Sequence, residues 1–473
     1  MRIVSKALLT VIAVIAPATA SYGQLFSTSS QYGVGIAPRS IGAADFDGDT
    51  DIDLAVANSG TDSVSVLMSN GDGTFAVAVE YATNLEPSAV GTGDLDGDGD
   101  IDLAIANWSS NNVSILKNNG DGSFGAGINI GTGVTPRAIS VGDFDGDTYL
   151  DLAVTGEWSD SVYVLINNGD GSFQTYVSYA AGDSPLSIWA DDFDNDTDLD
   201  LAVANSMNDS VSVLMNNGDG TYAAAVNYAV GDSPRSVVAA DLNGNGYADL
   251  VVANFGSHNV SVMLNKEDGT FAAPVTYNAA SAPRAVWAVE LDGDGYIDLA
   301  VVNRVSNNVT VLLNNGNGTF GPDADYAVGE GPSAIRAADL DGDADNDLIV
   351  ANYESDNISI LLNGEDINVG IDDDLNDDDL PNRVSLSQNY PNPFNPSTSI
   401  AFTLPSSSHV AINIYNVAGQ RVRQLLSESR AAGSHVVSWD SRDESGNSVS
   451  TGVYLYRLET DEFVDTRKMI LVK

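Results

Sequence analysis

The pattern of hydrophobic and polar residues repeats every 49 positions along most of the chain. In each copy, short apolar runs such as residues 54–58 alternate with polar turns that are rich in Asp, Asn and Gly. Short runs bounded by turn residues are typical of buried β-strands. The second copy predicts strands over 88–93, 102–107 and 112–118, then a turn at 119–122 and a fourth strand that starts at Phe124. The chain is therefore predicted to be an all-β repeat protein.

Single residues keep the same period. One proline opens each copy, at Pro38, Pro87, Pro136, Pro185, Pro234, Pro283 and Pro332. One aromatic residue follows the hairpin turn, at Phe75, Phe124, Phe173, Tyr222, Phe271 and Phe320. Seven copies with four strands each predict a seven-bladed β-propeller.

The two ends of the repeat region indicate how this ring closes. The seventh copy stops near residue 366 and has no aromatic residue at position 369, where the period would place one. Counting back by 49 from Phe75 and Tyr81 leads instead to Phe26 and Tyr32. Residues 25–32 are thus predicted to supply the missing strand of the seventh blade, which would cover the open sheet edges.

An acidic loop precedes the second strand of every copy. Positions 1, 3, 5 and 9 of the seven loops are, in chain order, Asp45, Asp47, Asp49 and Asp53; Asp94, Asp96, Asp98 and Asp102; Asp143, Asp145, Asp147 and Asp151; Asp192, Asp194, Asp196 and Asp200; Asp241, Asn243, Asn245 and Asp249; Glu290, Asp292, Asp294 and Asp298; and Asp339, Asp341, Asp343 and Asp347. Oxygen ligands at this spacing can converge on one hard divalent cation, together with a main-chain carbonyl near position 7.

Ca²⁺ is the predicted ion. Mg²⁺ keeps more of its waters, and Zn²⁺ calls for Cys or His, whereas the repeats contain no Cys and a single His, His258. The loops differ from an EF-hand, which has Glu at position 12, because that position is Val or Ile in every copy. The alternative is seven acidic surface turns without an ion, which the repulsion among so many carboxylates disfavours.

The charge of the chain is strongly negative and uneven. The formal net charge is −47, and residues 1–380 hold 10 Lys and Arg against 58 Asp and Glu, whereas residues 381–473 hold 9 against 8. A field of this sign argues against nucleic acid and anionic membranes as partners. Because the chain has no Cys, no disulfide can stabilise the fold, and bound metal is the cross-link that remains.

Residues 1–20 have the pattern of a secretory signal peptide. Arg2 and Lys6 precede an apolar run over 7–16, and small residues at 18–20 predict cleavage after Ala20. The apolar run is too short for a permanent membrane span, and no later segment is long enough. The mature protein is expected to be exported, without a transmembrane segment.

Three motifs of the repeat resemble those of a known family. Asp-x-Asp-Gly-Asp-x-x-x-Asp, Leu-Ala-Val-Ala-Asn and Asn-Asn-Gly-Asp-Gly-Ser-Phe are similar to the FG-GAP/VCBS-type repeats of integrin α-subunit propellers and related bacterial and fungal proteins. The resemblance covers residues 25–366 and implies a propeller domain at 21–366 whose loops bind Ca²⁺, up to seven ions, and stabilise the ring. The copies lack the Gly-Ala-Pro element of the full integrin motif, which indicates the shorter VCBS-like variant. The fifth loop, with Asn243 and Asn245, is expected to bind Ca²⁺ more weakly, and Glu290 in the sixth is longer than the Asp it replaces.

The C-terminal part changes character. Residues 367–381 form a predicted acidic linker, and residues 382–473 alternate as in a small Ig-like antiparallel β-sandwich. The segments at 388–398, 416–422, 452–456 and 466–473 resemble the type A C-terminal sorting domain of the bacterial type IX secretion system. That resemblance implies that the secretion machinery recognises residues 382–473 and that the protein is secreted or attached to the outer-membrane surface.

No catalytic constellation stands out in the sequence. With no Cys and with His258 alone in the repeats, cysteine nucleophiles and Ser-His-Asp machinery are nearly excluded, and His258 reads as a solvated loop residue. The spacing of the Asp residues is accounted for by metal. Trp189 and Trp287, which share one first-strand position, read as packing residues.

The copies differ on the face opposite the acidic loops. The position after the second strand reads Ser59, Trp108, Glu157, Ser206, Phe255, Arg304 and Tyr353, and the position after each proline reads Arg39, Ser88, Arg137, Leu186, Arg235, Arg284 and Ser333. Variable aromatic and Arg residues on one face are typical of a ligand surface, although ordinary loop residues would also fit. Two function classes remain: a binding or adhesion module for a glycan or protein ligand, which the absence of a long insertion favours, and a secreted polysaccharide lyase or hydrolase.

Overall fold

The computed structural model of the chain describes residues 25–26, 29–364, 385–386, 398–404, 407–416, 420–430, 433–439, 441–444, 448–460 and 463–471. The chain divides into two compact units, residues 1–367 and 368–473. The predicted signal peptide and the predicted linker at 367–381 lie outside the described residues. Within those residues every regular element is a strand, and none forms a helix that could cross a membrane.

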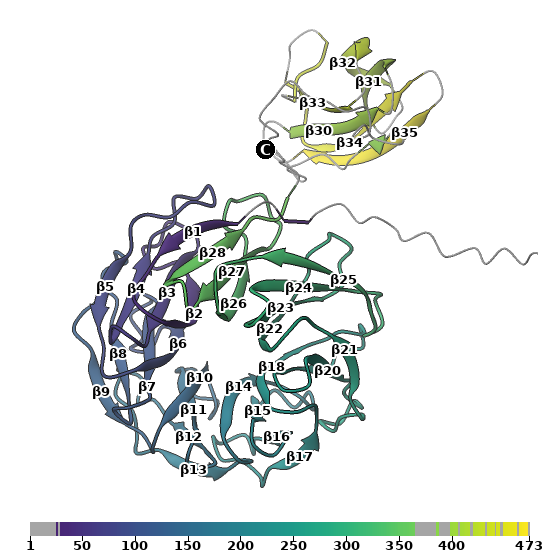
Figure 1. The fold of residues 1–473 in the computed structure, drawn as a ribbon. Helices are drawn as coiled ribbons and strands as arrows, with labels where there is room; N and C mark the ends of the chain where they lie inside the picture. Colours follow the sequence, from purple (N-terminus) through teal and green to yellow (C-terminus); the bar gives the residue numbers. More distant parts are fainter. Residues whose placement is uncertain are drawn as a thin grey trace, which may run out of the picture. The chain divides into compact units, whose positions relative to one another are not determined.

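The described strands of the first unit form seven antiparallel sheets of four strands each, arranged in a ring (Figure 1). The first strands lie nearest the centre and are β2 (Pro38–Ala44), β6 (Pro87–Gly93), β10 (Pro136–Gly142), β14 (Pro185–Asp191), β18 (Pro234–Ala240), β22 (Pro283–Val289) and β26 (Pro332–Ala338). The second strands are β3 (Asp53–Asn58), β7 (Asp102–Asn107), β11 (Asp151–Gly156), β15 (Asp200–Asn205), β19 (Asp249–Asn254), β23 (Asp298–Asn303) and β27 (Asp347–Asn352).

The outer half of each sheet holds the third and fourth strands. The third strands are β4 (Ser63–Leu67), β8 (Asn112–Leu116), β12 (Ser161–Leu165), β16 (Ser210–Leu214), β20 (Asn259–Met263), β24 (Asn308–Asn314) and β28 (Asn357–Leu361). The fourth strands are β5 (Val79–Ala82), β9 (Ile128–Gly131), β13 (Val177–Ala180), β17 (Val226–Ala229), β21 (Val275–Asn278), β25 (Phe320–Ala327) and β1 (Ser30–Gly33). Repeated four-stranded sheets in a ring are consistent with a β-propeller.

The predicted strands of the second copy are close to the observed ones, except for the fourth. Phe124 forms only an isolated bridge with Asn118, and β9 starts four residues later, at Ile128, which pairs with Ile115. Between these two pairings, residues 125–127 oppose only residues 116–117. One extra residue, as in a β-bulge, thus interrupts the pairing where the sequence pattern predicts a continuous strand.

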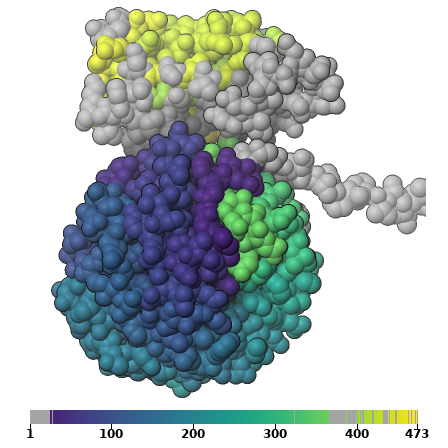
Figure 2. Space-filling model, turned by 60° about the vertical axis from the view of Figure 1, so that its left-hand side comes forward, coloured from purple at the N-terminus to yellow at the C-terminus, as the bar shows by residue number. Residues whose placement is uncertain are grey.

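The N-terminal segment completes the last sheet, as the sequence predicts. Strand β1 pairs with β28 in the order β1-β28-β27-β26, with Tyr32 opposite Ile358, and Phe26 forms a bridge with Asn363. In Figure 2 the purple N-terminal residues lie directly against the green residues of this sheet. First strands of neighbouring sheets contact one another all round, including β2 and β26. The ring therefore has no free end among its described strands.

The core of the first unit lies between neighbouring sheets. All residues of the second strands are buried, and each apolar cluster joins residues of two adjacent sheets. In every sheet except the third, where Ile130 replaces the Tyr opposite Phe173, the periodic aromatic residue packs edge-to-face on a Tyr of the preceding sheet. Tyr81 and Phe124 are one such pair, with ring centroids 5.5 Å apart. The same contact joins Tyr32 of the last sheet to Phe75 of the first at 5.5 Å. Edge-to-face aromatic pairs thus recur at successive sheet interfaces.

The second unit is a sandwich of two sheets. One has the order β29 (Ser385–Leu386), β30 (Thr398–Leu404) and β33 (Gly433–Trp439). The other has the order β32 (Arg421–Arg430), β31 (Ser408–Asn416), β34 (Gly452–Glu459) and β35 (Val464–Leu471). Residues from both sheets, including Phe402, Trp439, Tyr456 and Met469, form one core, so the predicted sandwich is confirmed within the described residues.

Candidate functional site

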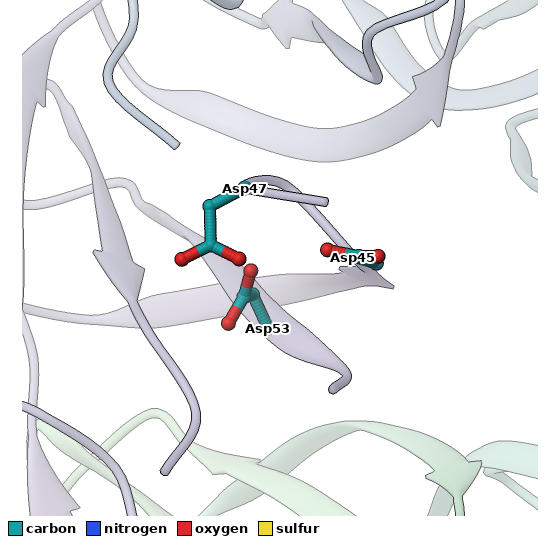
Figure 3. A group of neighbouring side chains, drawn as sticks. All are labelled: Asp45, Asp47 and Asp53. Atoms are coloured by element: carbon teal, nitrogen blue, oxygen red, sulfur yellow. The ribbon is translucent and has the colours of Figure 1, made fainter. Parts of the chain in front are cut away.

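Each acidic loop joins the first and second strands of one sheet. In the first loop, both carboxylate oxygens of Asp45 accept main-chain N–H groups, from Gly48 at 2.7 Å and Thr50 at 2.9 Å. These bonds turn the chain back on itself, and Gly48 lies in the left-handed region with φ of 79°. The turn brings Asp47 and Asp53 toward Asp45 (Figure 3), so that one carboxylate oxygen of each lies within 4.8 Å of the others.

The same three positions meet in the first four loops. The groups are Asp45, Asp47 and Asp53; Asp94, Asp96 and Asp102; Asp143, Asp145 and Asp151; and Asp192, Asp194 and Asp200. The predicted fifth-position ligands Asp49, Asp98, Asp147 and Asp196 are not members of these groups. They instead accept the N–H two residues further on, as Asp49 does from Asp51 at 2.9 Å. Three of the four predicted positions are thus brought together.

The ninth-position carboxylate has a structural role that the sequence did not reveal. Asp53 is buried, and its two oxygens accept the N–H groups of Phe46 at 2.9 Å and Ser69 at 2.7 Å. It therefore ties its loop to the end of the third strand, and the same pair of bonds recurs at Asp102 and Asp347. Burial raises the pKa of Asp53 to about 6 and that of Asp347 to about 7.

The fifth and sixth loops, whose sequences differ from the common pattern, also differ in geometry. Asn243 turns its amide nitrogen toward Asp249, with Nδ2 3.1 Å from Oδ2, where the other loops have a second carboxylate. In the sixth loop the group consists of Glu290, Asp292 and Asp294, without Asp298. The seventh loop keeps the common turn, with the N–H of Gly342 2.7 Å from Asp339 Oδ1.

Two of the loops contain an oxygen that lacks a partner. Asp96 Oδ1 and Asp194 Oδ1, both at the third position, are buried and accept no hydrogen bond from any described residue. The other oxygen of Asp96 lies 2.8 Å from Lys117 Nζ. A buried, unpaired carboxylate oxygen is costly unless a cation compensates it. Together with the converging carboxylates, these donor sets fit a hard divalent cation.

The sequence also did not predict the hydrogen bonds between neighbouring sheets. The amide Nδ2 of Asn118 donates to the carbonyl oxygen of Phe46 in the preceding sheet, at 2.8 Å. His258, although exposed as predicted, accepts the N–H of Ala282 in the following sheet at Nδ1, at 3.0 Å. The polar residues at the positions of Asn118 and His258 recur at intervals of 49 residues. This period is the sequence signal from which their structural role could have been predicted.

The face opposite the acidic loops contains a cavity of about 350 Å³, here called the arginine cavity. Its lining includes Arg39, Arg137, Arg235, Arg284 and Arg304, which are residues from the two variable positions. A second cavity of about 140 Å³ lies between the first strands and is lined in part by Trp189, Trp287 and Arg336. The two Trp rings pack edge-to-face, with ring centroids 5.4 Å apart, and both also contact the apolar core. They therefore pack between sheets, as predicted, and also line this cavity.

Large apolar side chains are exposed beside the arginine cavity. Trp158, Met207 and Val305 occupy one repeat position and are 69%, 79% and 65% exposed. Trp158 packs edge-to-face on Trp108 at 5.1 Å, and Trp108 Nε1 donates to Glu157 at 2.7 Å. Since these residues follow the second strands, they lie at the opposite end of each sheet from the acidic loops.

Comparison with known proteins supports this architecture. The FG-GAP-like repeat matches at residues 45–105, 94–154, 143–203, 192–252, 241–301 and 290–350, and the FlgD Ig-like domain at 391–462. Two crystal structures of BBS1N in complex with ARL6DN, soaked with lead and with mercury, are 15% and 14% identical. Each comparison covers 72% of this chain and 98% of the other, with TM-scores of 0.52 and 0.54. At this identity the likeness concerns the β-propeller fold alone.

One further structural neighbour is weaker. An Agrocybe aegerita lectin that recognises non-reducing terminal N-acetylglucosamine is 20% identical, covers 70% of this chain and 97% of its own, and has a TM-score of 0.48. No curated protein matches the sequence. Because the repeat matches together span residues 45–350, well over half of the chain, the protein belongs to the FG-GAP-like repeat family.

Proposed function

We propose that the acidic loops are structural Ca²⁺ sites, formed by the residues predicted from the sequence and strongest in the first four loops. The observation that carries this proposal is the set of converging carboxylates, two of which keep a buried oxygen without a partner at Asp96 and Asp194. A bound Ca²⁺ would offset the repulsion among these carboxylates and supply the partner that both oxygens lack. In the fifth loop the amide of Asn243 lowers the charge, so that site should be the weakest.

Thermal unfolding of the mature chain in excess Ca²⁺ and in EDTA tests this proposal. Large stabilisation by Ca²⁺, with six or seven bound ions counted by calorimetry, is the expected result, because a ligand that binds only the folded state stabilises it by mass action. Mg²⁺ at the same concentration is the control and should stabilise less, since it keeps more of its waters. Equal unfolding curves in Ca²⁺ and EDTA would refute the Ca²⁺ sites.

We also propose that the first unit is a closed seven-bladed propeller that acts as a non-catalytic binding or adhesion module. Its ligand, a glycan or a protein, would contact the face with the arginine cavity. The exposed apolar residues Trp158, Met207 and Val305 support this assignment, because all three lie at the same end of their sheets and large exposed apolar side chains are typical of interaction sites.

A glycan array probed with the full mature chain and with a Trp158→Ser, Met207→Ser double variant tests the binding face. Both residues are exposed, so the variant should unfold at the same temperature as the parent while losing most of its array signal. A Val77→Ser variant, which changes a residue that is 91% exposed on a fourth-strand connection, is the matched control and should keep the signal. An unchanged signal in the double variant would place the ligand elsewhere.

We further propose that the protein is exported by its N-terminal signal peptide and sorted by residues 382–473 through the type IX secretion system. This proposal rests on the sequence resemblance of residues 1–20 to a signal peptide and of residues 382–473 to a sorting domain. The Ig-like sandwich of the second unit is compatible with it. In a bacterium that carries this system, deletion of residues 382–473 should retain the protein in the periplasm, whereas fusion of these residues to a periplasmic reporter should deliver the reporter to the surface or medium. Secretion of the deleted protein would refute the sorting role.

A further inference from the structure

All six arginines of residues 21–366 line the cavities at the centre of the ring. This region holds 52 Asp and Glu against 8 Lys and Arg, and the six arginines are Arg39, Arg137, Arg235, Arg284, Arg304 and Arg336. Four of them directly follow the proline that opens a first strand, so the ring brings them from four different sheets to one place. Five of the six arginines therefore meet in the arginine cavity, and Arg336 lines only the smaller cavity beside it.

Few acids balance these arginines. Arg304 Nη2 lies 3.2 Å from Glu354, and Arg137 Nε lies 3.9 Å from Glu157. Glu86 also lines the arginine cavity. Arg235 Nε and Arg284 Nε are buried and have no hydrogen-bond acceptor among the described residues. The five guanidinium groups of the arginine cavity thus face three carboxylates, which leaves an excess of positive charge.

The excess is costly in the absence of an anion. Burial, and then the neighbouring Arg39, lower the pKa of Arg137 to about 10, and burial followed by Arg137 and Arg235 lowers that of Arg284. Removing a cation from water without a counter-charge is unfavourable, and like charges nearby add to the penalty. A bound anion would relieve both effects.

Aromatic rings hold several of these groups in place. The guanidinium carbons of Arg39 and Arg304 lie 5.2 and 5.0 Å from the ring centre of Tyr353, and that of Arg235 lies 4.9 Å from the ring centre of Phe255. Stacked arginines lose less conformational freedom when they bind an acceptor, and their fork geometry matches a carboxylate. The cavity is therefore preorganised for an anionic group.

We propose that the arginine cavity binds the carboxylate of an acidic glycan, such as a uronate-containing chain. This inference rests on the proposed function and names the ligand of its binding face. The exposed ring of Trp158 at the rim supplies an apolar surface for a sugar ring, which a simple anion does not need. The volume of about 350 Å³ is at the lower end of small-molecule pockets, enough for a terminal or single acidic unit.

Calorimetric titration of the full mature chain with a galacturonate trimer, in excess Ca²⁺, tests the proposal. A neutral galactose trimer and a penta-aspartate peptide are the comparison probes. The Arg284→Gln variant should bind the acidic trimer at least tenfold more weakly, and binding to the parent should weaken as salt increases. Lys266→Gln, which removes one exposed charge from a hairpin turn outside both cavities, is the matched control and should bind like the parent.

Thermal unfolding without ligand separates binding from folding. Arg284→Gln should unfold at the same or a higher temperature, because it removes a buried cation that has no counter-charge. If Arg284→Gln both binds more weakly and is less stable, Arg284→Lys distinguishes loss of charge from loss of structure. This variant keeps the charge and should retain part of the affinity, whereas complete loss of binding in Arg284→Lys would argue against charge recognition.

The comparison probes distinguish the failures. Equal binding of the acidic and neutral trimers, or equal loss in Arg284→Gln and Lys266→Gln, would overturn the acidic-glycan proposal. If a neutral glycan bound in a way that depended on Trp158 but not on Arg284, the binding module would stand and this inference would fall. Preferential binding of penta-aspartate would overturn the proposal that the ligand is a saccharide and would indicate an acidic peptide instead.

Discussion

The side-chain amide of Asn118 donates to the carbonyl of Phe46, a residue of the acidic loop in the preceding sheet, at 2.8 Å. The main-chain N–H of the same Asn118 donates to Asp102 in its own sheet at 2.8 Å. One residue thus joins two acidic loops. The bond to the preceding loop recurs at Asn167, Asn216, Asn265, Asn314 and Asn363. In the first sheet Ser69 replaces Asn, and the N–H of Gly73 reaches the carbonyl of Leu340 instead, at 2.9 Å.

Replacing Asn118 by Ala should therefore destabilise the ring. The change removes the bonds to Phe46 and to Ile101 and the acceptor of the Gly120 N–H, which together contribute about 2 to 4 kcal/mol. Ser69→Ala is the matched control and should cost about 1 kcal/mol or less, since the main chain makes the link between sheets there. Chemical denaturation in excess Ca²⁺ measures both. Equal losses would mean that the bond to Phe46 contributes little.

Asp194→Asn should change stability with opposite signs in the two metal conditions. In EDTA the variant should be as stable as the parent or more stable, because it neutralises a carboxylate whose buried Oδ1 has no partner. In Ca²⁺ at a hundred times the dissociation constant of the site, loss of the site should cost up to about 2.7 kcal/mol. A similar loss in both conditions would show that Asp194 stabilises the loop without metal.

Asp200→Asn should behave differently from its neighbour in the same loop. Its two oxygens accept the N–H groups of Phe193 at 3.1 Å and Asn216 at 2.7 Å. An Asn side chain would point its NH₂ at one of these donors, so we expect a loss of about 2 to 4 kcal/mol in EDTA as well as in Ca²⁺. Comparing the unfolding curves of the two variants separates the contribution of these two hydrogen bonds from that of metal binding. A loss of stability seen only in Ca²⁺ would argue that the hydrogen bonds contribute little.

The sequence predicted the features that depend on the repeat and missed those that depend on its assembly. Apolar runs and turn residues were enough for the first three strands of the second copy but not for the start of the fourth, and the position of Phe26 in the period was enough for the closing strand. The double role of Asp53 could not be predicted, because its two donors, Phe46 and Ser69, approach it only in the folded sheet. The sequence placed arginines from different copies on one face, but their meeting in one cavity could be seen only in the ring, in which residues 49 positions apart become neighbours.

His258 offers a test within one repeat position. Its Nδ1 accepts the N–H of Ala282 at 3.0 Å, as Asn111 Oδ1 accepts that of Thr135 at 2.8 Å, and both residues have φ near 55°. His258→Asn should keep or raise stability, since Asn tolerates the left-handed region and restores the oxygen acceptor. His258→Ala should lose about 1 kcal/mol. Denaturation of the two variants is the measurement, and an Ala variant as stable as the Asn variant would show that the bond to Ala282 is not needed.

Phe26 should be essential to stability although it lies near the start of the described chain. Its side chain is 1% exposed and packs edge-to-face on Tyr326 at 5.1 Å, and the Tyr326 hydroxyl accepts the N–H of Leu25 at 3.1 Å. Phe26→Ala should cost about 3 to 5 kcal/mol, as for a large side chain removed from a core. Val77→Ala, at a residue 91% exposed, should cost almost nothing. Denaturation of the mature protein compares the two. A near-neutral Phe26→Ala would mean that the N-terminal segment does not hold the last sheet closed, since the edge of β28 would then be stable without it.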